Sequence, residues 1–337
     1  MTFLTRDIPG CGGQFKATPE DFEVEELPAY APSGEGEHLF LWVEKRGLST
    51  PDMVKRLARA WNVRDDVFSW AGLKDAQAVT RQWVSLLSKD AKGQGVGDHE
   101  GFRVLAAIRH QNKLRNGHLA GNRFTLKVRG VRDAGAATAV LEILTKRGLP
   151  NFYGEQRFGI DGRNAEEGKR LLLTGARVPH FRHKLMLSAL QSKLFNDVLN
   201  QRLERDLFDV VRTGDVLKKH ATGGEFVCAD PAIDQPRADA FEVSATGPMF
   251  GPSMRPAEGE PGLEENLALT GFGLTSEAFE RGGRHTQGAR RHLRVALAPV
   301  DHSVKGDVLR LQFTLPAGSY ATVLLGELLK DENRRDL

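Results

Sequence analysis

One short segment carries a lysine and a carboxylate on a predicted connection between two strands. Residues 72–75 are Gly-Leu-Lys-Asp, and the bulky stretches 66–70 and 83–87 on either side are typical of short strands. Asp75 is the only carboxylate between those stretches. Gly72 permits backbone geometry that other residues resist. A carboxylate on such a loop can act as a nucleophile or a base, although the local pattern also fits a solvated surface turn.

Hydrophobic periodicity predicts the elements that position this segment. The residues from 124 to 128 and from 309 to 315 alternate between apolar and polar types, as expected of half-buried strands. Thr50 and Pro51 suggest a helix start, with Thr50 as the N-cap and an apolar stripe from Met53 to Trp61. Further predictions are strands at 39–43 and 102–108, a loop at 88–101, and helices at 133–146 and 186–203.

Composition restricts the class of protein. The chain has 337 residues, of which 40% are hydrophobic and 27% charged, values typical of a globular protein with two domains. No apolar run approaches the roughly 20 residues needed to span a bilayer, and the first residues lack a signal-peptide core. The two cysteines, Cys11 and Cys228, show neither a disulfide framework nor metal-ligand spacing. We therefore expect a cytoplasmic protein that binds no metal and no membrane.

Basic residues gather in two stretches. The formal net charge of +3 is too small to indicate an RNA partner by itself. Arg109, Lys113 and Arg115 lie within seven positions, and a second cluster spans residues 281–294. Such clusters attract phosphates, but a solvated basic face would look the same in sequence.

The Gly-Leu-Lys-Asp segment, followed by Ala78, Thr80 and Gln82, resembles the signature of the TruD family of tRNA pseudouridine synthases. Similar family motifs follow in the expected order, and the resemblance extends from Lys16 to about Leu329. They are Lys16 with Pro-Glu-Asp-Phe at 19–22, the basic segment at 109–122, Asn-Phe-Tyr-Gly-Glu-Gln-Arg-Phe-Gly at 151–159, Ser-Ala-Leu-Gln-Ser-Lys-Leu-Phe-Asn at 188–196, and Leu-Pro-Ala-Gly-Ser-Tyr-Ala-Thr at 315–322.

The resemblance implies roles for individual residues. Asp75 corresponds to the catalytic aspartate, and a lysine beside it would keep the carboxylate ionised. Tyr153 stands where the family mostly has phenylalanine; it keeps a face for stacking on uracil and adds a hydroxyl that needs a partner when buried. The implied substrate-binding residues are Lys16, Phe22, Lys74, Asn151, Tyr153 and Tyr320, and the implied phosphate contacts are Arg109, Lys113 and Arg115.

The implied fold is α/β (α+β), with a mostly antiparallel sheet, flanking helices and an inserted α/β domain, the TRUD domain. We expect the catalytic domain to comprise residues 1–176 and 299–337, and the inserted domain to comprise residues 177–298. The cleft between them is expected to be basic and to take structured RNA.

The implied reaction is the isomerisation of uridine to pseudouridine, at uridine 13 of tRNA, by a monomer without cofactor or metal. The expected partner is tRNA. Asp75 would attack the sugar or the base, or remove a proton, and the sequence leaves these roles open. A non-catalytic RNA-binding protein with the same fold is the alternative, although Asp75 and the pocket residues argue against it. A glycosidase-like hydrolase would need a second facing carboxylate, and none stands out.

Overall fold

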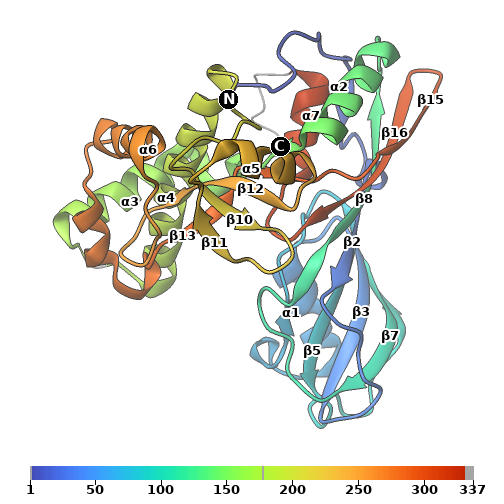
Figure 1. Ribbon diagram of the computed structural model, residues 1–337. Coiled ribbons are helices and arrows are strands. Elements are labelled where there is room, and N and C mark those ends of the chain that lie inside the picture. The colour runs from blue at the N-terminus through green and yellow to red at the C-terminus, as the bar shows by residue number, and fades with distance from the viewer. Residues whose placement is uncertain (1, 177, 331–337) are drawn as a thin grey trace. The chain divides into compact units, whose positions relative to one another are not determined.

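A ten-stranded, mostly antiparallel sheet forms most of one of the two compact units in the computed structural model (Figure 1). The structure describes residues 2–176 and 178–330. We call Cys11–Gly135 with Leu297–Gly318 the sheet unit. The remaining described residues form the helical unit, to which both ends of the described chain belong.

The sheet unit has the strand order β15-β16-β8-β2-β5-β3-β7-β6, with β1 paired to β8 and β4 to β5. Only the β2–β5 pair is parallel. Central β8 is therefore flanked by strands from opposite ends of the chain. The bounds are β1 Gln14–Phe15, β2 Phe22–Pro28, β3 His38–Arg46, β4 Ser69–Trp70, β5 Val79–Leu87, β6 Gly97–His99, β7 Phe102–His110, β8 Leu119–Arg129, β15 Asp301–Lys305 and β16 Val308–Pro316.

Helix α1 (Thr50–Trp61) packs on this sheet through the predicted apolar stripe. Met53, Leu57 and Trp61 are buried with Leu41 and Val43 of β3 in one core cluster. The helix begins differently from the prediction, because the side chain of Ser49, rather than Thr50, caps it by accepting the N–H of Asp52. Thr50 is buried, and its hydroxyl forms hydrogen bonds with Gln82 and Lys74 instead. Two short 3₁₀ helices complete the unit, η1 (Pro19–Asp21) and η2 (Asp65–Val67).

The helical unit combines six helices of the described chain with two small sheets. The helices are α2 Ala134–Arg147, which starts at the unit boundary, α3 Arg163–Thr174, α4 His180–Glu204, α5 Pro231–Asp239, α6 Gly259–Gly271 and α7 Ala321–Leu329. The order β11-β10-β12-β13 joins Glu225–Val227, Val216–Lys219, Val243–Met249 and Ala289–His292, while β9 Leu149–Pro150 pairs with β14 Arg294–Val295. The 3₁₀ helices are η3 Glu155–Phe158, η4 Ile160–Gly162 and η5 Ser276–His285.

The long helix α4 carries the core of the helical unit. It contains the predicted helix at 186–203 and begins six residues earlier, at His180. Leu187, Leu190 and Leu194 are fully buried and share a cluster with residues from α3, α6 and η5. Figure 1 shows α3 and α6 beside α4.

Besides the helix start, two local predictions are wrong, those at 66–70 and 88–101. Residues 66–70 do not form a strand, because 65–67 close a 3₁₀ turn and only Ser69 and Trp70 pair with β5. The predicted loop at 88–101 contains β6, which pairs with β7. Gly72 has no positive φ, and the nearest atom to a Cβ placed there would be the Lys74 Nζ at 3.9 Å. A side chain would thus fit at Gly72 in this conformation.

The predicted fold class, α/β with a mostly antiparallel sheet and helices against it, is confirmed. Within the described ranges, no helix combines the length and apolar character needed to cross a membrane. The expected domain limits, after residues 176 and 298, follow the family's organisation and stay a prediction.

Candidate active site

The connection between β4 and β5 is held by a buried chain of hydrogen bonds. The Thr50 hydroxyl donates to Gln82 Oε1 at 2.8 Å and accepts the backbone N–H of Lys74 at 2.9 Å. The Gln82 amide in turn donates to the carbonyl of Gly72 at 3.3 Å. Helix α1, strand β5 and the loop thus fix one another, which gives Asp75 a defined position.

Asp75 contacts Lys16, 59 residues earlier in the chain, in an ion pair. Its other carboxylate oxygen accepts the backbone N–H of Gln77 at 3.0 Å. The Asp75 side chain remains 23% exposed, whereas the Lys16 side chain is 6% exposed. The lysine is therefore held inside the protein while one region of the carboxylate stays open to a ligand.

Lys16 is constrained by its backbone and by its surroundings. Its φ of 58° lies in the left-handed region, which costs a non-glycine residue about 1–2 kcal/mol. Its ammonium nitrogen lies 4.5 Å from the centre of the Phe22 ring, at the start of β2. The ring and the carboxylate together hold the cation. The structure thus brings Lys16, Phe22 and Asp75 together, and their roles toward a substrate stay predictions.

The electrostatics favour an ionised Asp75. Burial alone would raise the pKa of this carboxyl, but the hydrogen bond and charge of Lys16, the Gln77 N–H and the charge of Lys45 outweigh it and lower the pKa. Lys45 donates to the carbonyls of Asp75 and Leu48 at 2.7 and 2.5 Å. Burial lowers the pKa of Lys45 to about 8, although the charge of Asp75 opposes that effect.

Lys74 points into the sheet unit. Its side chain is 5% exposed, and its Nζ forms an ion pair with Oε2 of Glu26 at 2.7 Å. The other oxygen of Glu26 accepts the backbone N–H of Trp83 at 3.2 Å. The pair links the loop to β2 and β5, and a substrate contact for Lys74 stays a prediction.

A second group of predicted residues gathers in the helical unit around Asn151. The Asn151 side chain accepts from Arg291 at 2.6 Å and from the Ser319 hydroxyl at 3.3 Å, and it donates to the carbonyl of His292 at 2.9 Å. Arg291 also donates to the backbone carbonyl of Asn151. Asn151 is 6% exposed. These bonds fix the amide and hold the guanidinium of Arg291 beside it.

Tyr153 lies in an aromatic and cationic cluster. The Arg291 guanidinium is centred 4.0 Å from its ring, and the rings of Phe195 and Tyr320 meet it edge-on at 5.6 and 6.2 Å. Its hydroxyl donates to the sulfur of Met249 at 3.5 Å, a weak acceptor. Burial raises the pKa of Tyr320. The structure thus brings together Asn151, Tyr153 and Tyr320.

Arg109, at the start of the basic segment, lies far from Asp75 within the sheet unit. Arg109, Lys113 and Arg115 are exposed. Arg109 pairs with Leu39 near the start of β3, whereas Lys45, which reaches Asp75, is near the end of that strand. At about 3.3 Å per residue the separation is roughly 20 Å. Glu25 of β2 forms its ion pair with Arg123, at 3.0 Å, and not with this segment.

Sequence inspection did not single out Lys45, Glu26 or Arg291 as individual site residues. The first two could have been found from strand alternation. Lys45 lies on the same side of β3 as the buried Leu41 and Val43, and Glu26 lies on the same side of β2 as its buried residues. A charged residue on the inward side of a strand needs a buried partner. Arg291 was visible only as one member of the second basic cluster.

Comparison with known proteins places these two groups of residues in a family. The family model described as tRNA pseudouridine synthase D (TruD) matches residues 1–176 and 174–328. The chain is 48% identical to the tRNA pseudouridine synthase D of Anaeromyxobacter dehalogenans (strain 2CP-1), covering 98% of this chain and 97% of that one. It is 45% identical to a same-named protein of Thermus thermophilus, covering 98% and 92%.

A solved structure has the same fold. The crystal structure of a Methanosarcina mazei protein assigned as a tRNA pseudouridine synthase D superimposes with a TM-score of 0.72 at 22% identity, over 98% of this chain and 96% of that one. The likeness at this identity concerns the fold, whereas the family model and the bacterial relatives concern the sequence over its whole length. This chain belongs to the tRNA pseudouridine synthase D family.

Proposed function

We propose that the chain isomerises uridine 13 of tRNA to pseudouridine, with Asp75 as the catalytic carboxylate. The observation that carries this proposal is the Lys16–Asp75 pair, in which a lysine buried beside the carboxylate keeps it charged while part of it stays accessible. The family to which the chain belongs supports the reaction class. Position 13 rests on the resemblance of the motifs alone.

The reaction is an isomerisation, so no oxidant or reductant is required. The bond from N1 of uracil to the ribose breaks and the released base turns. A bond then forms from C5 to the ribose, while C5 loses a proton and N1 gains one. An ionised Asp75 can attack the sugar or the base, or accept the C5 proton. The lowered pKa keeps the carboxylate ionised, and its partial exposure leaves it available for each of these roles.

The aromatic residues of the helical unit would hold the uracil. We assign stacking to Tyr153, with Tyr320 as a second wall and Asn151 as the polar group. Arg291 positions both, because it bonds the Asn151 amide and lies against the Tyr153 ring. Lys16 and Phe22 would border the base beside Asp75, and Lys74 would contribute mainly by holding the loop.

The tRNA backbone would be contacted by Arg109, Lys113 and Arg115. These side chains are exposed and of the type that binds phosphates without reading the base. Arg109 lies roughly 20 Å along β3 from Lys45, which contacts Asp75. We retain residues 177–298 as the inserted domain and residues 1–176 with 299–337 as the catalytic domain.

The test is tritium release from tRNA transcripts carrying uridine labelled at C5, incubated with the purified protein alone. We expect release from a transcript with uridine at position 13 and none from a matched transcript with cytidine there. Mapping of pseudouridine in the product should place it at position 13. Pseudouridine found only elsewhere would refute the position, and no release from any tRNA would refute the activity.

A further inference from the structure

A cavity of about 470 Å³ in the helical unit is lined by none of the site residues described above. One wall is a single face of α4, formed by residues spaced three or four positions apart, and the other is the end of η5. The lining residues are His180, Lys184, Ser188, Gln191, Arg284 and His285. We call this cavity the α4 pocket.

The α4 pocket is cationic. Its lining contains a lysine, an arginine and two histidines, and it contains no carboxylate. The pKa of His285 is lowered by burial first and then by the charges of His180, Arg284, His183 and Lys184. Apart from burial, the groups that lower this pKa are all basic side chains, and no carboxylate is among them.

The contacts within the pocket indicate a place for an anion. A guanidinium nitrogen of Arg284 lies 2.7 Å from Nε2 of His180, and the rings of His180 and His285 meet edge-on at 4.7 Å. This contact occupies one nitrogen of Arg284, whose guanidinium carries five N–H donors in all. An anion beside this guanidinium and Lys184 would accept charge-assisted hydrogen bonds from both.

The α4 pocket is connected to the aromatic cluster by one side chain. Arg157, from the 151–159 motif, donates a hydrogen bond to the hydroxyl of Ser188 in the pocket wall. The same guanidinium is centred 5.4 Å from the Tyr153 ring. Ser188 in the pocket wall and the ring to which we assign uracil stacking therefore contact the same guanidinium.

We propose that the α4 pocket binds a backbone phosphate of the tRNA, close in sequence to the uridine that stacks on Tyr153. The inference rests on the proposed function, because it takes that uridine as its reference point. Lys184 and Arg284 provide the charge and Ser188 a hydroxyl. Free inorganic phosphate has the same chemistry as the backbone group, so the experiment has to separate the two.

The first measurement is the dissociation constant for an unmodified tRNA transcript at several salt concentrations. We compare wild type with Lys184→Ala, Arg284→Ala and the double variant. Arg182→Ala is the matched control, since it removes an equal charge from an exposed position on the same turn of α4 but outside the pocket lining. The log–log salt slope should become shallower by about 0.7–0.9 for each phosphate interaction that is removed. The control should change less than either pocket variant.

The second measurement identifies the phosphate. Transcripts with a single neutral methylphosphonate, placed in turn at linkages around the target uridine, are bound to wild type and to the double variant. Wild type should lose affinity at one or two linkages, and the double variant should show no additional loss there. Melting temperatures check the folding of each variant. If the double variant is unstable, Lys184→Gln is measured in its place, because Lys184 is exposed and its replacement should not disturb the fold.

Two results would overturn the proposal: pocket variants that bind tRNA with the same affinity and slope as Arg182→Ala, or equal sensitivity to every methylphosphonate in both proteins. Titration with inorganic phosphate completes the test, since binding of that ion without any change in tRNA affinity would indicate a free-anion site. The outcome is separable from the proposed function. If the pocket variants weaken tRNA binding but the wild type releases no tritium, only the proposed activity is refuted. If the wild type releases tritium normally but the pocket variants bind tRNA as the control does, only the phosphate site is refuted.

Discussion

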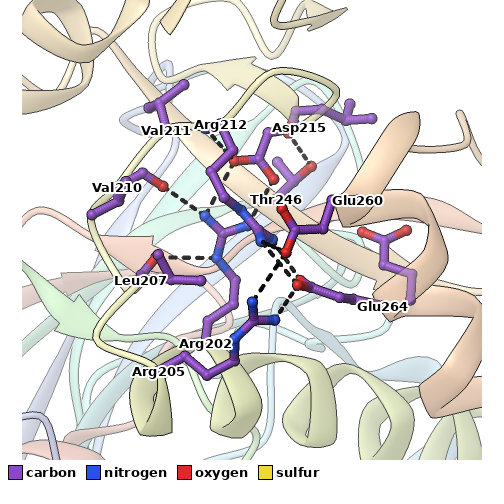
Figure 2. A network of polar contacts seen from close by, with 12 residues as sticks. Arg202, Arg205, Leu207, Val210, Val211, Arg212, Asp215, Thr246, Glu260 and Glu264 are labelled. Carbon is purple, nitrogen blue, oxygen red and sulfur yellow. Dashed lines mark hydrogen bonds and ion pairs between the residues drawn. The ribbon is translucent and has the colours of Figure 1, made fainter.

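Asp75 and Asp215 are both paired with cationic side chains, yet the two carboxylates are held very differently. Asp215 faces Arg202 in the helical unit, and their side chains are 3% and 5% exposed (Figure 2). Arg202 donates to both oxygens of Asp215, at 2.7 and 3.1 Å, and the backbone N–H of Arg212 adds a third bond at 2.8 Å. Asp75 receives only a lysine and one backbone N–H, and is 23% exposed.

The guanidinium of Arg202, which faces Asp215, has further hydrogen-bond acceptors. Arg202 also donates to the carbonyls of Val210 and Leu207, so its guanidinium has a partner in each direction (Figure 2). Next to it, Glu264 accepts from Arg212 and Arg205. The hydrogen bonds from Arg212 first, then those from Arg205, lower the pKa of Glu264 to about 2 against the effect of burial.

The difference separates two uses of an ion pair. A carboxylate that accepts in every direction, away from water, is fixed in position and has no lone pair for a ligand. A carboxylate held by one cation at its buried side keeps both its charge and its access. Burial of the lysine rather than of the aspartate is therefore the feature that distinguishes the proposed active site from the structural network.

The largest effect is expected for Asp75→Asn, which keeps the shape and removes the charge. We expect pseudouridine formation to fall by at least about 10³-fold, while tRNA binding by the folded protein stays within a few-fold. The melting temperature should fall, because the buried Lys16 loses its charged partner. Tritium release, binding titration and thermal unfolding of the purified variant check this. A variant that works at nearly the wild-type rate would remove Asp75 from the mechanism.

Asp215→Ala should have the opposite profile. Removing this partner leaves the buried Arg202 unpaired, which typically costs about 3–5 kcal/mol of stability. Urea unfolding at neutral pH measures the cost. At low temperature the folded fraction should still form pseudouridine at the wild-type rate per molecule. Asp215→Ala with unchanged stability would contradict the structural assignment of the network.

Tyr153 tests the aromatic cluster. If the ring stacks on uracil, Tyr153→Ala should lose about 1–3 kcal/mol of interaction with the base, whereas Tyr153→Phe should be mild. The readout is kcat/KM for tritium release. The phenylalanine variant also removes the hydroxyl bond to Met249. Equal damage in both variants would show that the hydroxyl matters and that the stacking account is wrong.

Lys16→Met should change the pH dependence of the reaction, because the variant keeps most of the packing on Phe22 and removes the charge. Lys16 is the main group that lowers the pKa of Asp75, so its loss should raise that pKa and move the acidic limb of the kcat/KM profile to higher pH. The stability from this pair is present above the unfolded pKa of the aspartate and is lost as pH falls through the folded pKa. An unmoved acidic limb would exclude Asp75 as the titrating group.

The smallest effect is expected at the basic segment. Lys113→Ala and Arg115→Ala should each raise the tRNA dissociation constant, flatten the salt slope by about 0.7–0.9 and leave the melting temperature unchanged. The chemical step on bound tRNA should also be unaffected. A lowered melting temperature with an unchanged slope would show that the segment stabilises the fold instead.

Strand alternation identified much of the sheet. The alternating residues of β8 and β16 correctly predicted two strands, and the structure shows that they pair with each other. The apolar stripe of α1 correctly predicted the face that packs on the sheet. The strand prediction for 66–70 was wrong because it rested on the bulky residues of that stretch. Local hydrogen bonds instead form a 3₁₀ helix at residues 65–67. Propensity describes a residue's preference and not the bonds its neighbours offer.

The candidate site was less accessible to sequence reasoning. Lys16 and Asp75 are 59 residues apart, and only the family resemblance connected them before the structure did. Lys45 reaches Asp75 because β3 and β5 align Lys45 with Thr80, and no periodicity within either strand fixes that register. Charged residues in phase with a buried face indicate that a partner exists, but the choice of partner depends on how the strands pair.

The position of β16 beside β8 bears on how the chain is synthesised (Figure 1). Residues 121–129 emerge from the ribosome long before residues 308–316, which pair with them along their whole length. Until then, the outer edge of β8 presents unpaired backbone groups, an arrangement that slows folding and invites association with other chains. The helical unit is closed equally late, because Glu327 of α7 accepts the N–H groups of Leu4 and Thr5 at 2.8 and 3.1 Å. A nascent chain that already contains every proposed active-site residue up to Tyr153 would therefore still lack the segments that complete both units.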